Sequence, residues 1–97
     1  MKRISWTSQA FTDLESILNF YARDSEVYAR RIGERINAAI ERLEAFPRSG
    51  RVVPELGRED VREVLPAPFR VVYRVLDDEV FILTVFHAAR SFPEIKF

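Results

Sequence analysis

His87 and Arg90 are the residues whose types and spacing most directly suggest proton transfer beside an anion. His87 is the only histidine among the 97 residues. Its imidazole, with an ordinary pKa of about 6.5, can donate or accept a proton near neutral pH. It follows an apolar segment with the pattern of a strand, and it would face the same groove as Arg90. The simpler interpretation is a half-buried histidine that hydrogen-bonds backbone at the end of a sheet.

Arginine supplies nearly all of the positive charge. Of the 15 Lys and Arg residues only two are lysines, which leaves 13 arginines. We predict that Arg62, Arg70 and Arg74 form a basic strip on one face of a sheet, where guanidinium groups suit a phosphate backbone or an acidic protein segment. The open alternative is a solvated sheet face on which Glu63 and aspartates pair with these arginines.

The composition limits the class of protein. The 15 acidic and 15 basic side chains give a net charge of zero, which argues against a strongly basic nucleic-acid-binding protein. The absence of cysteine excludes disulfides, thiolate nucleophiles and zinc ribbons, and we expect no cofactor or metal. The sequence has no apolar run of about 18 residues and no signal-peptide pattern, so no membrane association is expected. We therefore expect one cytoplasmic domain, residues 1–97.

The first half of the chain predicts a short strand and two helices. Alternation over residues 3–7 indicates the strand, and Thr7 or Ser8 can cap the first helix. A second helix should begin after Asp24 or Ser25. The short loop between the helices predicts an antiparallel hairpin.

Each helix has one apolar face. The helix spacing selects, in the first helix, Ala10, Leu14, Ile17, Leu18 and Tyr21. In the second it selects Ala29, Ile32, Ile36, Ile40 and Leu43, with Ala39 beside them. The second helix should end near Phe46, because Pro47 disfavours helical backbone in its predecessor.

The second half predicts strands. After a turn at 47–51 and a short extended piece at 52–56, strands are expected at 61–65, 69–76 and 80–86, the last two joined by a turn. The predicted fold class is α+β, in the order β-α-α-β-β-β. The helical hairpin should cover one face of a small, mainly antiparallel sheet, and the arginine strip should lie on the other.

Four segments of the chain carry a family resemblance. They are the first helix, with Asp13 among its apolar positions, the junction 39–51 with the Pro-Glu-Leu segment 54–56, the strand segment 69–75, and the segment 85–90. In order and spacing they resemble the ParE/RelE superfamily of bacterial toxins over nearly the whole chain. The resemblance implies a toxin of a plasmid-stabilising type II toxin–antitoxin system. It implies as partner a cognate antitoxin whose acidic or flexible C-terminal segment wraps the toxin. It also implies contact with DNA only through that antitoxin.

The resemblance leaves the target open between DNA gyrase and messenger RNA in the ribosome. In the RNA-cleaving branch it implies catalytic roles for Arg70, Arg90 and His87. That branch usually also carries lysines on the strand equivalent to 61–65 and often a tyrosine or histidine near the C-terminus. This chain has no lysine on that strand, and the residues after Arg90 include no tyrosine, only Phe92 and Phe97.

We therefore favour a ParE-like toxin that inhibits DNA gyrase. The alternatives are a RelE-like ribosome-dependent endoribonuclease and a non-toxic module that binds antitoxin. The residues predicted to contact the target or the antitoxin are Arg62, Arg70, Arg74, His87, Arg90 and Phe92.

Overall fold

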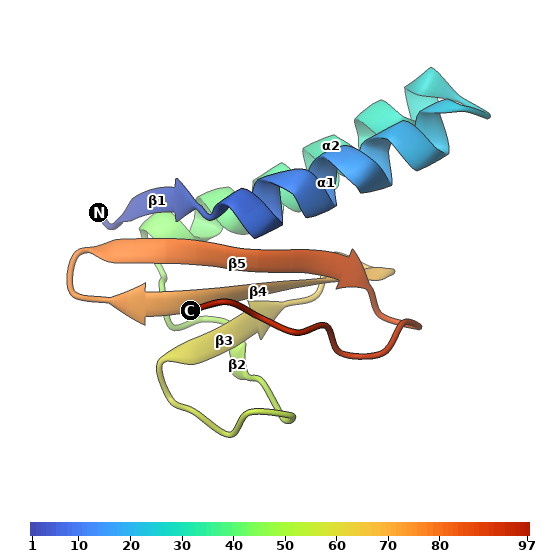
Figure 1. The fold of residues 1–97 in the computed structure, drawn as a ribbon. Helices are drawn as coiled ribbons and strands as arrows, with labels where there is room; N and C mark the ends of the chain where they lie inside the picture. Colours follow the sequence, from blue (N-terminus) through green and yellow to red (C-terminus); the bar gives the residue numbers. More distant parts are fainter.

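Two layers make up the molecule: a helical hairpin lies against one face of a five-stranded sheet (Figure 1). The computed structural model describes all of residues 1–97. In chain order the elements are β1 (Arg3–Trp6), α1 (Ser8–Ala22), α2 (Glu26–Glu41), the 3₁₀ helix η1 (Arg42–Glu44), β2 (Arg51–Val52), β3 (Val61–Val64), β4 (Phe69–Leu76) and β5 (Glu79–His87). The predicted α+β class and element order are confirmed, with β2 as one additional strand. Neither helix has the length and apolarity needed to span a bilayer.

The sheet has the strand order β1-β5-β4-β3-β2. Strands β2 to β5 form an antiparallel meander, and β1 joins the outer side of β5 in parallel. The sheet is therefore mainly antiparallel, as predicted. Of the extended piece predicted at 52–56 only Val52 forms a strand, β2 begins at Arg51 inside the predicted turn, and residues 54–56 turn instead.

Side-chain caps determine where the two helices begin. Thr7 accepts a hydrogen bond from the backbone N–H of Ala10 at 3.1 Å. Ser25 accepts one from the N–H of Tyr28 at 3.1 Å. Each cap satisfies a backbone donor that the first helical turn leaves free. Helical geometry after Ser25 continues through η1 to Glu44, two residues short of the predicted end.

The main core lies between the hairpin and the sheet. All the apolar positions predicted for both helices lie in it or pack against it, apart from Ala29 and Ala39, which are buried on the second helix. Strand β4 contributes alternate residues, as period-two geometry requires. In β5 the alternation shifts between Ile82 and Val85, because the register with β4 shifts between Val72 and Tyr73. These sheet residues are Phe69, Val71, Tyr73, Val75, Val80, Ile82 and Val85.

A second, smaller core lies on the other face of the sheet. It is formed by Val53, Val61, Val72, Leu83 and Phe86. The C-terminal tail turns back along the sheet after β5 (Figure 1), and Phe92 and Ile95 pack against this cluster. The side chain of Gln9 holds the tail by donating to the carbonyl of Glu94 at 2.9 Å and accepting from the N–H of Lys96 at 3.3 Å.

Candidate functional site

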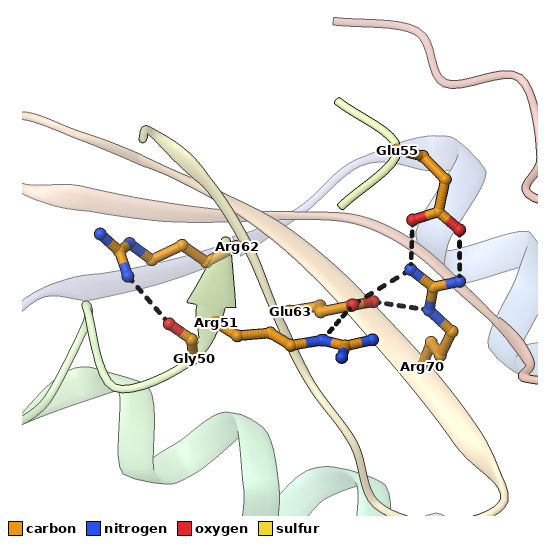
Figure 2. A network of polar contacts seen from close by, with 6 residues as sticks. All are labelled: Gly50, Arg51, Glu55, Arg62, Glu63 and Arg70. Carbon is orange, nitrogen blue, oxygen red and sulfur yellow. Dashed lines mark hydrogen bonds and ion pairs between the residues drawn. The ribbon is translucent and has the colours of Figure 1, made fainter. Parts of the chain in front are cut away.

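Arg70 lies on the sheet face that points away from the helices, enclosed by two carboxylates (Figure 2). Its Nε and Nη2 donate to Glu63 at 2.6 and 3.0 Å, and its Nη1 and Nη2 donate to Glu55 at 2.9 and 2.7 Å. Arg70 is only 9% exposed. A guanidinium has five N–H groups, and four are used here. Arg70 therefore has little capacity left to bind a phosphate.

Glu63 is shared between two arginines. Its side chain is fully buried, and its Oε2 also accepts from Arg51 Nε at 2.7 Å (Figure 2). The hydrogen bonds from Arg70 lower the pKa of Glu55 to about 2. The bonds to Glu55 and then to Glu63 raise the pKa of Arg70. Two cations and two anions thus neutralise one another, which is the condition under which buried charges are tolerated.

Two aromatic rings complete the surroundings of Arg70. Its guanidinium carbon lies 5.1 Å from the ring centroid of Phe86 and 5.3 Å from that of Phe92. The rings meet edge to face with centroids 5.6 Å apart. Phe92, which is also predicted as a contact residue, packs against the second core and covers the arginine.

Arg74 follows Arg70 on the same face of β4 and is also paired. Its Nε donates to Asp60 at 2.9 Å, and Asp60 accepts two further bonds from Arg58 at 3.1 and 2.9 Å. The hydrogen bonds from Arg58 are the main cause that lowers the pKa of Asp60. On this face the arginines therefore pair with carboxylates, as in the alternative prediction. Arg70 and Glu63 are, however, buried there and not solvated.

Arg62 does not belong to that face, so the prediction of a single strip of three arginines is wrong. It pairs in register with Tyr73, whose ring lies in the main core, so Arg62 points to the helical side. Its Nη1 donates to the carbonyl of Gly50 at 3.0 Å (Figure 2), and its Nη2 donates to Glu59 at 2.9 Å. Residues of β3 alternate between faces, and the arginine therefore falls on the opposite side from its neighbour Glu63.

Gly50 allows the chain to approach β4 closely. Its N–H donates to the hydroxyl of buried Tyr73 at 2.9 Å, and burial raises the pKa of that hydroxyl. A Cβ at Gly50 would lie 2.5 Å from both the Tyr73 hydroxyl and the carbonyl oxygen of Glu63. Glycine is required at this position, which directly precedes β2 and Arg51, the register partner of Glu63.

His87 and Arg90 lie together at a cleft of about 620 Å³ between α1 and the end of β5. His87 packs edge to face against Phe69, with ring centroids 5.7 Å apart. Its Nδ1 accepts from the N–H of Ala89 at 3.0 Å, so the neutral ring carries its proton on Nε2. Arg90 is exposed and has no carboxylate partner. His87 is thus both half-buried with a backbone bond and open to the groove it shares with Arg90.

The three groups predicted for RNA cleavage do not converge. Phe69 is the register partner of His87, and Arg70 is the partner of Phe86. Phe69 belongs to the main core and Phe86 to the second core. The side chain of Arg70 therefore lies on the face of the sheet opposite His87.

A second groove, of about 580 Å³, lies between α2 and the free edge of the sheet. Arg35 and Arg42 line it from the helical side, and Arg51 lines it from β2. Arg35 donates only to the carbonyl of Ala67, and neither Arg35 nor Arg42 has a carboxylate within ion-pair distance. The groove is therefore electropositive in a chain of zero net charge.

Glu55 was not predicted as a partner of these arginines, whereas Glu63 and an aspartate were the open alternative. Glu55 lies in a loop, where a carboxylate normally remains in solvent, and its position beside β4 depends on tertiary structure. Glu63 carries a weak signal, because period two places it on the same face as buried Val61. No group of three or more His, Asp or Glu side chains lies together in a way that could hold a metal ion.

Comparisons with known proteins agree over nearly the whole chain. Residues 4–92 match a family model described as the ParE toxin of the type II toxin–antitoxin system parDE. The chain is 37% identical over 97 residues to a protein named toxin Y4kP from Sinorhizobium fredii, covering 97% of this chain and 96% of the relative. It is 34% identical over 90 residues to toxin RelE2 from Caulobacter vibrioides, covering 93% and 99%. A solved structure titled "Chromosomal ParDE TA system from P. aeruginosa" is similar with a TM-score of 0.74 and 26% identity, covering 90% of this chain and 96% of that one.

Proposed function

This chain belongs to the ParE family of toxins from type II toxin–antitoxin systems, and from that premise we propose that it arrests growth in the cytoplasm by inhibiting DNA gyrase. We further propose that a cognate antitoxin neutralises it by binding.

The pairing of Arg70 carries the choice of target. Cleavage by attack of a 2′-OH needs a base, an acid and cations around one phosphate. Arg70 donates four hydrogen bonds to Glu55 and Glu63, so its charge is already neutralised. Its position on the face opposite His87 supports a toxin that acts by binding.

Strand β3 and the tail support the same choice. The residues of β3 are Val61, Arg62, Glu63 and Val64. Its only cation points to the helical side, and its carboxylate is held by two arginines. Phe92 in the tail has no proton to exchange and packs against Phe86. Neither element offers the additional acid or cation that a nuclease would require.

The antitoxin contact is supported by charge and by exposed apolar surface. The groove beside Arg35 and Arg42 has guanidinium groups without carboxylate partners, which suits an acidic segment. Near the hairpin tip, Phe20, Val27 and Tyr28 are 57%, 53% and 46% exposed. Apolar side chains grouped in this way favour a segment that folds on binding.

Among the residues predicted for the target, His87 and Arg90 alone keep free polar groups at a cleft. We place the target contact there. Arg62, Arg70 and Arg74 are occupied by Glu59, by Glu55 with Glu63, and by Asp60.

Two assays on one induction experiment test the target. Purified toxin should block supercoiling by gyrase, and its induction in cells should cause a DNA-damage response. Primer extension on the same cells should find no cuts within translated codons. Cuts together with unaffected gyrase would establish the endoribonuclease alternative. Normal growth together with intact antitoxin binding would establish the non-toxic module.

A further inference from the structure

The cleft at the end of β5 has an aromatic wall. Tyr21 contacts Phe20 and Phe69 edge to face, with centroids 5.2 and 6.2 Å apart, and all three rings line the cleft. Phe20 is 57% exposed, and Arg23 lies over its ring at 5.7 Å. Aromatic side chains in a concave site of this size provide surfaces on which a flat ring can stack.

A free carboxylate oxygen lies in the same cleft. The Oδ2 of Asp13 accepts from the hydroxyl of Thr84 and from the N–H of Val85, the latter at 3.3 Å. Its Oδ1 makes no hydrogen bond, and no buried side-chain oxygen lacks a partner. Oδ1 is therefore reached by solvent, and because Asp13 lines the cleft, it presents one acceptor to a ligand.

The other polar groups of the cleft suit an anion. His87 has its Nε2–H free, because Nδ1 already accepts from Ala89. Arg90 has an unpaired guanidinium. The cleft thus combines a hydrogen-bond acceptor, an aromatic wall and two donors for a negative group.

From this combination we propose that the cleft binds one unpaired nucleotide whose base carries an exocyclic amine. Cytosine, adenine and guanine have such an amine, whereas uracil and thymine present carbonyl oxygens there. The amine donates to Asp13 Oδ1, the base lies against the aromatic wall, and the phosphate contacts Arg90 and the Nε2–H of His87. An acidic peptide fits less well, because Asp13 would repel its carboxylates. The proposal does not depend on the gyrase target.

NMR titration of the purified toxin with mononucleotides tests the proposal directly. CMP should shift the amide signals of residues around Asp13 and Arg90 and bind about fivefold more tightly than UMP, the difference of one hydrogen bond. The capped dipeptide N-acetyl-Asp-Phe-amide should bind more weakly than CMP. Equal affinity for CMP and UMP, tighter binding of the peptide, or no saturable shifts with CMP would overturn the proposal, whatever gyrase does.

Asp13→Asn provides a switch of specificity. The Asn carbonyl can keep the bonds from Thr84 and Val85, which places the NH₂ donor in the cleft. The variant should then prefer UMP over CMP by about the same factor. An unchanged preference in a folded variant would contradict the assignment of Asp13. If the variant fails to fold, the wild-type comparison of CMP with UMP still decides.

Arg90→Gln tests the phosphate end. Affinity for CMP should fall about tenfold, as expected for loss of a charge-assisted hydrogen bond, while affinity for cytidine should not change. Arg30→Gln, an exposed position on α2 outside the cleft, is the matched control and should bind both ligands as wild type does.

A trinucleotide with a central dC tests whether the source is a single strand. Its binding more tightly than dCMP would assign the site to single-stranded nucleic acid, and equal binding would assign it to free nucleotides.

Discussion

Arg70 and His87 lie on neighbouring strands but act on opposite faces of the sheet. Their register partners, Phe86 and Phe69, belong to different cores. The arginine belongs to a buried ion network, and the histidine lies at an open cleft. The three groups predicted for RNA cleavage therefore do not meet on one face of the sheet.

Removal of Glu63 should destabilise the fold strongly. Glu63→Ala leaves buried Arg70 and partly exposed Arg51 without their shared carboxylate. The free energy of unfolding in urea should fall by about 3–5 kcal/mol, as for other broken buried pairs. Glu59→Ala is the matched control: Glu59 pairs with Arg62, but its side chain is 84% exposed, so the loss should stay below about 1 kcal/mol. Equal losses in the two variants would disprove the importance of burial.

Glu55 should make stability depend on pH in the acid range. Its pKa is about 2 in the folded chain against an ordinary 4.5. Because the folded-state pKa is lowered, the ionised carboxylate stabilises the fold above pH 4.5, and this contribution is lost as the pH falls towards 2. Urea unfolding of wild type and Glu55→Gln should therefore differ by a constant amount above pH 4.5 and converge below it. A difference that persists unchanged to pH 2 would be inconsistent with this pairing.

Phe92 should contribute to stability rather than to target recognition. It covers Arg70 and Phe86, so Phe92→Ala should lower the free energy of unfolding by about 2 kcal/mol, less than a fully buried phenylalanine. Inhibition of gyrase per folded molecule should not change. Phe97→Ala, at a 56% exposed terminal ring, serves as the control with a smaller loss. A fully stable Phe92→Ala toxin that no longer inhibits gyrase would restore Phe92 as a contact residue.

Charge reversal in the second groove should weaken antitoxin binding. In Arg35→Glu combined with Arg42→Glu, the acidic segment meets like charge, so affinity should fall about tenfold and association should slow, most at low salt. Arg30 lies outside the groove. Arg30→Glu reverses one charge, where the double variant reverses two, and it should have little effect. Calorimetry and stopped-flow measurements across a salt series check this, and equal effects of both variants would exclude the groove.

The elements of the fold could be predicted from the sequence because their signals are local. The apolar spacing of α1 and α2, the caps Thr7 and Ser25, and the alternation in β4 each depend on near neighbours. The placement of Arg70 and Arg74 on the face away from the helices was predicted for the same reason. Strand β2 was missed, because two residues carry no periodicity and their pairing depends on the contact of Gly50 with Tyr73.

The candidate site was harder to predict because it depends on pairing between distant segments. Whether Arg70 is free or neutralised is decided by Glu55, 15 residues earlier in a loop. The side on which Arg62 lies is decided by its register with Tyr73. The grouping of His87 with Arg90 could be predicted, because the two residues lie close together in the sequence at the end of one strand. The part played by Asp13 was not, because its partner Thr84 is 71 residues away.

We propose that the toxin acts on gyrase through the open end of the sheet that carries Arg90 and not by cutting RNA. The most direct measurement is gyrase supercoiling with wild type and Arg90→Glu, with primer extension on cells expressing each. We predict that wild type inhibits supercoiling and that Arg90→Glu, which removes an exposed and unpaired cation, folds normally but inhibits about tenfold less. We also predict that neither protein cuts messenger RNA. Codon-specific cuts by wild type, with supercoiling unaffected at toxic levels, would contradict the account.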